Sequence, residues 1–203
     1  MVYKKYFNDR RLIRTRINSK FYSYTGGKIS QYDDIIKEYA EKLGWDWRLL
    51  ASLIYQESEF NSNAKSWAGA VGLMQLLPVT AKSYGAVNPY EPHQSLAAGY
   101  KYLKWLDKYW SKFIPDKKER IKFVLASYNI GFGHIQDARR LAEKYGANPN
   151  IWDNNVEVYL LKKSDPKYYN DPLVKNGYCS GIETVEYIRE IFNRYSHYKQ
   201  FIP

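Results

Sequence analysis

The chain has 203 residues, of which 45% are apolar and 26% are charged, and its formal net charge is +10. This length allows one compact core but leaves little room for two independent domains. The single cysteine, Cys179, excludes an internal disulfide framework and a cysteine-based metal cluster. No stretch of the sequence approaches the roughly 20 apolar residues of a membrane span, and the basic beginning is not followed by the apolar run of a secretory signal.

The positive charge is concentrated in residues 1–28, which hold eight basic residues against one acidic residue, Asp9. Such a segment could bind an anionic polymer by charge attraction. The distinguishing recognition residues of a nucleic-acid module are not visible, however. We therefore interpret residues 1–30 as a basic linker or a remnant of a preceding domain, expect no nucleic-acid partner, and assign residues 31–203 to a single folded domain.

The apolar periodicity of that domain is helical almost everywhere. The tract 31–43 predicts a first helix that ends at Gly44, and Asp46 can cap the next helix, WRLLASLIYQES. Further helices are predicted at 78–84, 92–113, 117–128, 134–146 and 182–198, with a looser stretch rich in Asn, Asp and Pro at 146–181. The sequence has no convincing alternating strand run and no internal repeat, so the predicted fold class is mostly α.

One carboxylate of the second helix falls on its apolar face. Glu57 lies four residues after Leu53 and seven after Leu50, whereas Glu59 is 200° further round the helix and points away. A carboxylate in such a position is costly unless it is paired, hydrogen-bonded or protonated. The same conditions raise the pKa of a carboxyl group and make it a useful general acid. A capping or ion-pair role for Glu57 is the structural alternative.

The residues after Glu57 favour a ligand-binding loop. Small residues at positions 68, 69, 70 and 72 suit a tight turn, or a backbone against which a polymeric ligand lies closely. Met74 then offers a soft apolar surface, and Gln75 offers an uncharged donor and acceptor, as a sugar would require. Taken singly, each of these residues is more often a packing residue.

Three strings, in order along the chain, resemble a known family. The first is ES.F followed by A.S..GA.GLMQ..P.TA over residues 57–81, the second is LASYNIGFGHIQDA at 125–138, and the third is ETVEYI at 183–188. Together they resemble the lytic transglycosylases of the goose-type lysozyme (SLT) superfamily, over roughly residues 30–203. The resemblance implies a single lysozyme-like helical domain with a substrate cleft.

The activity implied by this resemblance is cleavage of the β-1,4 bond between N-acetylmuramic acid and N-acetylglucosamine in peptidoglycan. An ordinary glycosidase needs two carboxylates, but the first string supplies only one that can face a cleft. In a transglycosylase, Glu57 would protonate the leaving oxygen and then take the proton of the muramic acid C6 hydroxyl as that oxygen attacks C1. The product would be a 1,6-anhydro sugar.

The resemblance also assigns sugar-binding residues: Ser66, Met74, Gln75, Tyr128 and Asn129, with Glu183 nearby. Structural alternatives remain for Tyr128 as a core residue, for Glu183 as a favourable acid at a helix start, and for Ser66 as a turn former. The histidines, His93, His134 and His197, lack a ligand spacing, so we expect no metal and no cofactor. The tryptophans, including Trp45, Trp47, Trp105, Trp110 and Trp152, are expected to build the core, and the alternative for a few of them is stacking on sugar rings.

Two other functions stay open at this point. A hydrolytic lysozyme would need a second carboxylate or an ordered water opposite Glu57, and the candidate carboxylates are Asp33, Asp34, Glu91 and Glu183. A non-catalytic wall-binding module would bind peptidoglycan strands without cutting them.

The partner implied by the resemblance is the peptidoglycan glycan strand. The segment NSKFYSYTGGKISQYDD is similar to the junction in the membrane-bound murein transglycosylase F type, where a solute-binding-like domain comes first. The location expected from the substrate is the bacterial cell envelope, in the periplasm and associated with the outer membrane in the full-length protein. Residues 146–181 could form a cleft wall or a variable insertion.

Overall fold

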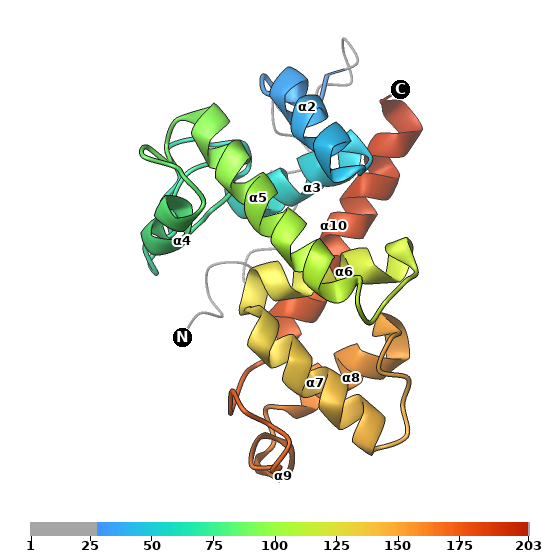
Figure 1. The fold of residues 1–203 in the computed structure, drawn as a ribbon. Helices are drawn as coiled ribbons and strands as arrows, with labels where there is room; N and C mark the ends of the chain where they lie inside the picture. Colours follow the sequence, from blue (N-terminus) through green and yellow to red (C-terminus); the bar gives the residue numbers. More distant parts are fainter. Residues whose placement is uncertain (1–27, 203) are drawn as a thin grey trace, which may run out of the picture. The chain divides into compact units, whose positions relative to one another are not determined.

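The computed structural model describes residues 28–202, so the basic segment 1–30 lies almost wholly outside the described residues. Helices account for the regular structure of this part of the chain, in which no strand is formed, and the mostly α prediction is confirmed (Figure 1). They are α2 (Asp33–Leu43), α3 (Trp47–Ser58), α4 (Pro78–Ser83), α5 (Pro92–Trp110), α6 (Lys117–Ile130), α7 (Phe132–Lys144), η1 (Trp152–Val156), α8 (Glu157–Lys162), α9 (Pro166–Tyr169) and α10 (Ile182–Phe201). Among residues 28–202, no helix is both long and apolar enough to cross a bilayer.

The described residues divide into two compact units. The first comprises residues 28–80, 87–96 and 191–202, and the second comprises residues 81–86 and 97–190. Helices α4, α5 and α10 therefore contribute residues to both units.

In the first unit, the predicted helix ends are confirmed. Gly44 ends α2 in the left-handed conformation at φ 63°, and Asp46 caps α3 by accepting a hydrogen bond from the backbone N–H of Arg48. Asp46 also pairs with the Arg48 guanidinium at 2.8 Å and accepts a hydrogen bond from the Tyr195 hydroxyl at 3.1 Å. Arg48 in turn donates to the carbonyl of Ile202 at 2.7 Å. The cap that begins α3 thus also holds the last turns of α10.

In the second unit, the core is built around α6. Phe123 is fully buried there, and Trp110 donates its indole N–H to the Ser127 hydroxyl at 2.9 Å.

The expectation that tryptophans build the core is confirmed for Trp45, Trp110 and Trp152, of which each is at most 7% exposed. It is wrong for Trp105, which is 40% exposed.

The stretch 146–181 is more ordered than its composition predicted, since it contains η1, α8 and α9. A buried carboxylate on α7 holds the last part of this stretch in place. Asp137 is fully buried and accepts hydrogen bonds from the backbone N–H groups of Lys175 and Asn176, both at 2.9 Å. It also pairs with Lys163, directly after α8, at 2.8 Å and with Arg140. Composition could not reveal this anchor because its partners other than Arg140 lie 26 to 39 residues away along the chain.

Two titratable groups beside this anchor have shifted pKa values. Burial lowers the pKa of His134, and the neighbouring Lys163 ammonium, whose Nζ lies 3.0 Å from the ring Nδ1, lowers it further. Cys179 is 6% exposed, and burial raises the pKa of its thiol.

We predict that Asp137→Asn strongly destabilises the protein, because Lys163 would stay buried without its counter-charge. Removal of one partner of a buried ion pair costs about 3 to 5 kcal/mol, to be measured by urea unfolding. The matched control is Asp153→Asn, which removes an ion pair with Lys122 at a side chain that is 60% exposed. The control should cost about 1 kcal/mol or less, and equal losses in both variants would contradict the prediction.

We also predict that His134 makes stability fall in mildly acidic solution. Its folded pKa lies below the unfolded value of about 6.5, so the unfolded chain binds more protons as the pH drops through 6.5. The free energy of unfolding should therefore decrease by up to about 1.4 kcal/mol per pH unit below 6.5. His134→Gln, which cannot titrate, should flatten this slope in urea unfolding between pH 5 and 7, and an unchanged slope would refute the assignment.

Candidate active site

A pocket of about 690 Å³ surrounds the end of α3 in the first unit. This volume lies within the range of small-molecule sites. The lining residues come from the two positions before α2, from the segment 55–65, from Gln75 and from Arg194 of α10. Glu57, predicted as the catalytic acid, is one of them.

Glu57 lies in the last turn of α3 and is half-buried, whereas Leu50 and Leu53 on the same helix face are fully buried. The helix ends one residue later, at Ser58, because Glu59 and Phe60 both adopt left-handed backbone conformations at φ 52° and 61°. Two consecutive non-glycine residues in this region are uncommon and cost about 1 to 3 kcal/mol each. The surrounding structure must therefore hold this turn in place.

Arg194 is the residue that holds the end of α3 from α10. Its guanidinium donates to the Ser52 carbonyl at 3.3 Å and to Gln56 Oε1 at 3.1 Å, and it lies 4.3 Å above the Tyr55 ring. Tyr55 in turn contacts the Phe60 ring edge-on at 5.7 Å. Arg194 was not predicted from the sequence. Its position three residues after Ile191, which is buried, could have indicated a cation on the apolar face of the helix.

Glu59 also lines the pocket, although the helical wheel placed it on the opposite side from Glu57. The wheel assumed a helix that continues, whereas the left-handed turn at Glu59 redirects the chain. Neither Asp33 nor Glu91, two of the expected second carboxylates, lines the pocket. Asp33 is buried and accepts the backbone N–H groups of Ile29 and Ser30, and Glu91 accepts those at the start of α5. Asp34 is exposed and does not line the pocket either.

The loop after the pocket contains the close approach that its small residues predicted. A Cβ atom on Gly72 would lie 1.9 Å from the carbonyl oxygen of Pro89, so only glycine fits there. Ser66 forms the turn at the other end, since its hydroxyl accepts the Ala70 N–H at 3.0 Å. Ser66 therefore forms a turn, which was the structural alternative to sugar binding. Its contact with a sugar stays a prediction.

The Met74–Gln75 pair divides between the core and the pocket. Gln75 lines the pocket at φ 46°, and its Nε2 donates to the carbonyls of Ala64 at 3.1 Å and Gly72 at 2.9 Å. This leaves Oε1 as the acceptor that a ligand can use. Met74 is fully buried, so its expected contact with a sugar stays a prediction that requires the side chain to become accessible.

The remaining predicted site residues, Tyr128, Asn129 and Glu183, belong to the second unit. The Thr184 hydroxyl donates to Asn129 Oδ1 at 2.7 Å and so joins the first turn of α10 to the end of α6. Glu183 precedes Thr184 and is half-buried, and burial raises the pKa of its carboxyl group. The Tyr128 ring lies 5.3 Å from that of Tyr102. In the part of the chain that the structure describes, no group of three His, Cys, Asp or Glu residues could hold a metal ion.

The sequence model of the transglycosylase SLT domain matches residues 34–151. This match covers more than half of the 203 residues, and the chain belongs to that family. The family resemblance drawn from the three strings is thereby confirmed.

Among curated proteins, the chain is 38% identical over 181 residues to the membrane-bound lytic murein transglycosylase F of Desulfosudis oleivorans, covering 89% of this chain and 39% of the relative. It is 43% identical over 169 residues to the protein of the same name from Shewanella pealeana, covering 83% of this chain and 34% of the relative. The chain thus spans well under half the length of these relatives.

Two solved structures show the same fold. The lytic transglycosylase Slt of Pseudomonas aeruginosa aligns with a TM-score of 0.56, and the 70 kDa soluble lytic transglycosylase of Escherichia coli aligns with a TM-score of 0.57. Each is 22% identical, and each alignment covers 84% of this chain and 24% of the other. The predicted lysozyme-like helical fold is confirmed by these alignments.

We predict that Gly72→Ala disrupts the loop, because the new methyl group would collide with the Pro89 carbonyl at a positive φ. The expected loss is about 2 to 5 kcal/mol of unfolding free energy. Gly69→Ala is the control: its φ is also positive, at 85°, but no atom lies within 4 Å of the added methyl group. This control should cost about 1 to 2 kcal/mol. Urea unfolding of both variants tests the difference, and equal losses would argue against the close approach.

Proposed function

We propose that the chain is the catalytic part of a peptidoglycan lytic transglycosylase. The observation that carries the proposal is the position of Glu57, half-buried at the end of α3 and lining a pocket within the segment that matches the SLT family. The names of the two relatives support murein as the substrate. Cleavage of the bond between N-acetylmuramic acid and N-acetylglucosamine is then the reaction.

In the proposed reaction, Glu57 acts first as acid and then as base. Its carboxylic acid gives a proton to the bridging oxygen as the bond from C1 to that oxygen breaks. The C6 hydroxyl oxygen of the muramic acid bonds to C1, and its proton passes to the Glu57 carboxylate. No water molecule is consumed, because the proton that Glu57 donates is replaced by the proton of the C6 hydroxyl. The product ends in a 1,6-anhydro ring. A partly buried carboxyl group that is shielded from bulk water suits the first step.

The other site residues are proposed to position the sugar. Gln75 is best supported, because it lines the pocket with its Oε1 available to accept from a hydroxyl or amide. Ser66, Met74, Tyr128, Asn129 and Glu183 are proposed as further contacts from the family resemblance. For Asn129, the bond from Thr184 would hold the amide in a fixed orientation.

A hydrolytic lysozyme is the second candidate, and Glu59 is the observation that favours it. This carboxylate lines the same pocket as Glu57 and is exposed to water. A hydrolase would use a second carboxylate either to activate water or to attack C1. In a transglycosylase, Glu59 would neither activate water nor attack C1.

The proposed partner is the glycan strand of peptidoglycan, and the proposed location is the bacterial cell envelope, in line with the membrane-bound relatives. We also propose that the full-length protein is periplasmic, associated with the outer membrane, and has a preceding solute-binding-like domain. The part of the relatives that this chain does not match leaves room for such a domain. We retain residues 1–30 as a linker to such a domain and residues 31–203 as the transglycosylase domain.

We predict that Glu57→Gln abolishes release of soluble muropeptides from purified sacculi, lowering the rate by at least about 1,000-fold as expected for loss of an acid–base group. Mass spectrometry of the wild-type products should give masses one water lighter than reducing muropeptides. Glu41→Gln, an exposed change on α2, should keep wild-type rates and the same products.

Glu59→Gln separates the two candidate reactions. If the enzyme is a transglycosylase, this variant should still release anhydro products at a rate within about tenfold of wild type. Reducing products from the wild type, together with a rate loss in Glu59→Gln that matches that of Glu57→Gln, would establish the hydrolase instead. No release by any of the proteins would leave binding without cleavage as the function.

A further inference from the structure

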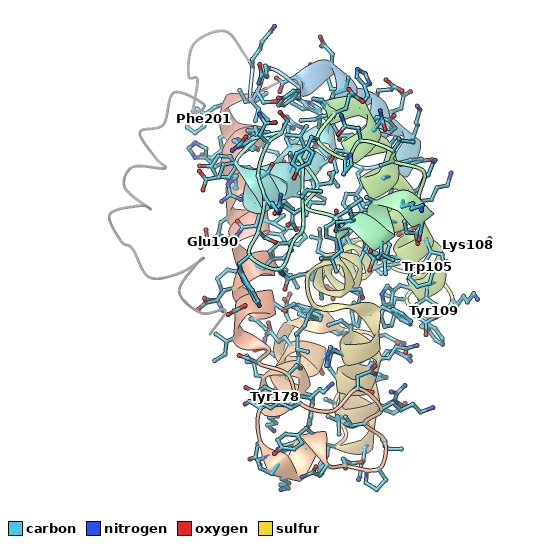
Figure 2. All side chains as sticks on the ribbon, turned by 90° about the vertical axis from the view of Figure 1, so that its left-hand side faces the viewer. Trp105, Lys108, Tyr109, Tyr178, Glu190 and Phe201 are labelled. Atoms are coloured by element: carbon cyan, nitrogen blue, oxygen red, sulfur yellow. The ribbon has the colours of Figure 1, made fainter. Side chains whose placement is uncertain are left out.

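The outer face of α5 carries aromatic side chains where a surface helix ordinarily carries polar ones. Leu106 and Trp110 on the inner face are at most 1% exposed. Tyr102, Trp105 and Tyr109 follow one another at three- and four-residue spacing, and their successive ring centroids lie 6.1 Å apart, with planes inclined by 19° and 25°. We call these three residues the aromatic row. Figure 2 shows Trp105 and Tyr109 projecting from the helix on the same side.

The aromatic row is held in place by its neighbours rather than free to rotate. Phe132, at the start of α7, contacts Trp105 edge-on at 5.3 Å and Tyr109 at 5.6 Å. The Tyr109 hydroxyl accepts a hydrogen bond from Gln136. Trp105 and Phe132 nevertheless stay 40% and 36% exposed. Exposed apolar side chains that cluster in this way are a feature of binding sites, whereas scattered single ones are normal, and fixed rings lose little entropy on binding.

The charges around the aromatic row are mainly positive. Asp107 is the acidic residue of this stretch, and it pairs with Arg120 at 2.8 Å. Arg139 lies 4.7 Å above the ring of Phe113, which continues the exposed aromatic surface beyond Tyr109. The exposed basic residues of α5 and the turn after it are Lys101, Lys104, Lys108 and Lys112. A ligand of this surface should therefore combine flat apolar faces with negative charge.

We propose that the aromatic row is a second docking surface for a peptidoglycan glycan strand that carries carboxylates on its peptide stems. The C–H faces of pyranose rings would stack on Trp105 and Tyr109, and Lys108 would meet the carboxylates. This inference rests on the proposed function, because the row is continuous with Tyr128, a proposed sugar contact, whose ring lies 5.3 Å from that of Tyr102. None of the row residues lines the pocket around Glu57.

Two other occupants are less well supported. A second copy of the chain would bring like charges on the two lysine-rich faces together in a symmetric pair, which is unfavourable. Single-stranded nucleic acid could also stack on aromatic rings near basic side chains. Continuity with Tyr128 favours the glycan strand, and both alternatives are outcomes of the experiment below.

The test measures equilibrium binding to purified sacculi by co-sedimentation, with every protein in the Glu57→Gln background so that the sacculi stay intact. Trp105→Ala combined with Tyr109→Ala should weaken binding by about tenfold or more, the effect of losing two stacking rings. Trp105→Phe combined with Tyr109→Phe keeps both rings and should bind within about threefold of the unsubstituted protein. Tyr178→Ala removes a 60% exposed aromatic side chain of the same unit and should not change binding (Figure 2).

Thermal unfolding of each variant shows whether a loss of binding is caused by a loss of folding. If the double alanine variant unfolds at a lower temperature than the unsubstituted protein, the Lys108→Glu variant replaces it. This variant is expected to lose a similar factor in binding to sacculi. Unchanged binding of the folded variants, or no binding of the unsubstituted protein, would overturn the inference. So would row-dependent binding to a single-stranded DNA oligomer without row-dependent binding to sacculi, or row-dependent dimers in sedimentation. Muropeptide release by the wild type, recorded in parallel, tests the proposed function separately, since the binding result does not depend on cleavage.

Discussion

The end of α3 is the constraint on which the proposed active site depends. The helix stops one residue after Glu57, and it does so through two left-handed residues, Glu59 and Phe60, neither of which is a glycine. This conformation is unfavourable on its own, so it needs support from outside the helix. Arg194 supplies that support by binding both the backbone and the side chains of the final turns. A carboxylate at a helix terminus, rather than within the helix, can be shielded on one side and open to a pocket on the other.

Buried charge has a comparable structural role in each of the two units. Arg194 is 9% exposed in the first unit, and Asp137 and Lys163 are fully buried in the second. In each case the charged group joins segments that are far apart in sequence. A buried ion pair adds little net stability compared with apolar packing, but it penalises any arrangement in which its partners separate. The Asp137–Lys163 pair therefore disfavours any arrangement that separates α7 from the residue after α8.

The sequence predicted the parts of the structure that local rules govern. Gly44 and Asp46 mark helix ends because their conformational and capping preferences act over a few residues. The lining role of Glu59 was not predictable from a helical wheel, because the left-handed turn that redirects it depends on distant support. The buried position of Met74 was not predictable either, because an adaptable side chain that could suit a ligand is equally suited to a core, and tertiary packing decides where it lies.

The single cysteine has a consequence for the chemistry of the environment in which the chain can work. Thiol oxidation and disulfide exchange proceed through the thiolate, and Cys179 is both 6% exposed and raised in pKa by burial. Little thiolate forms at neutral pH, and what forms is shielded from other molecules. The folded chain is therefore protected from covalent cross-linking between copies in an oxidising compartment, and only unfolding would make it a substrate for thiol oxidants.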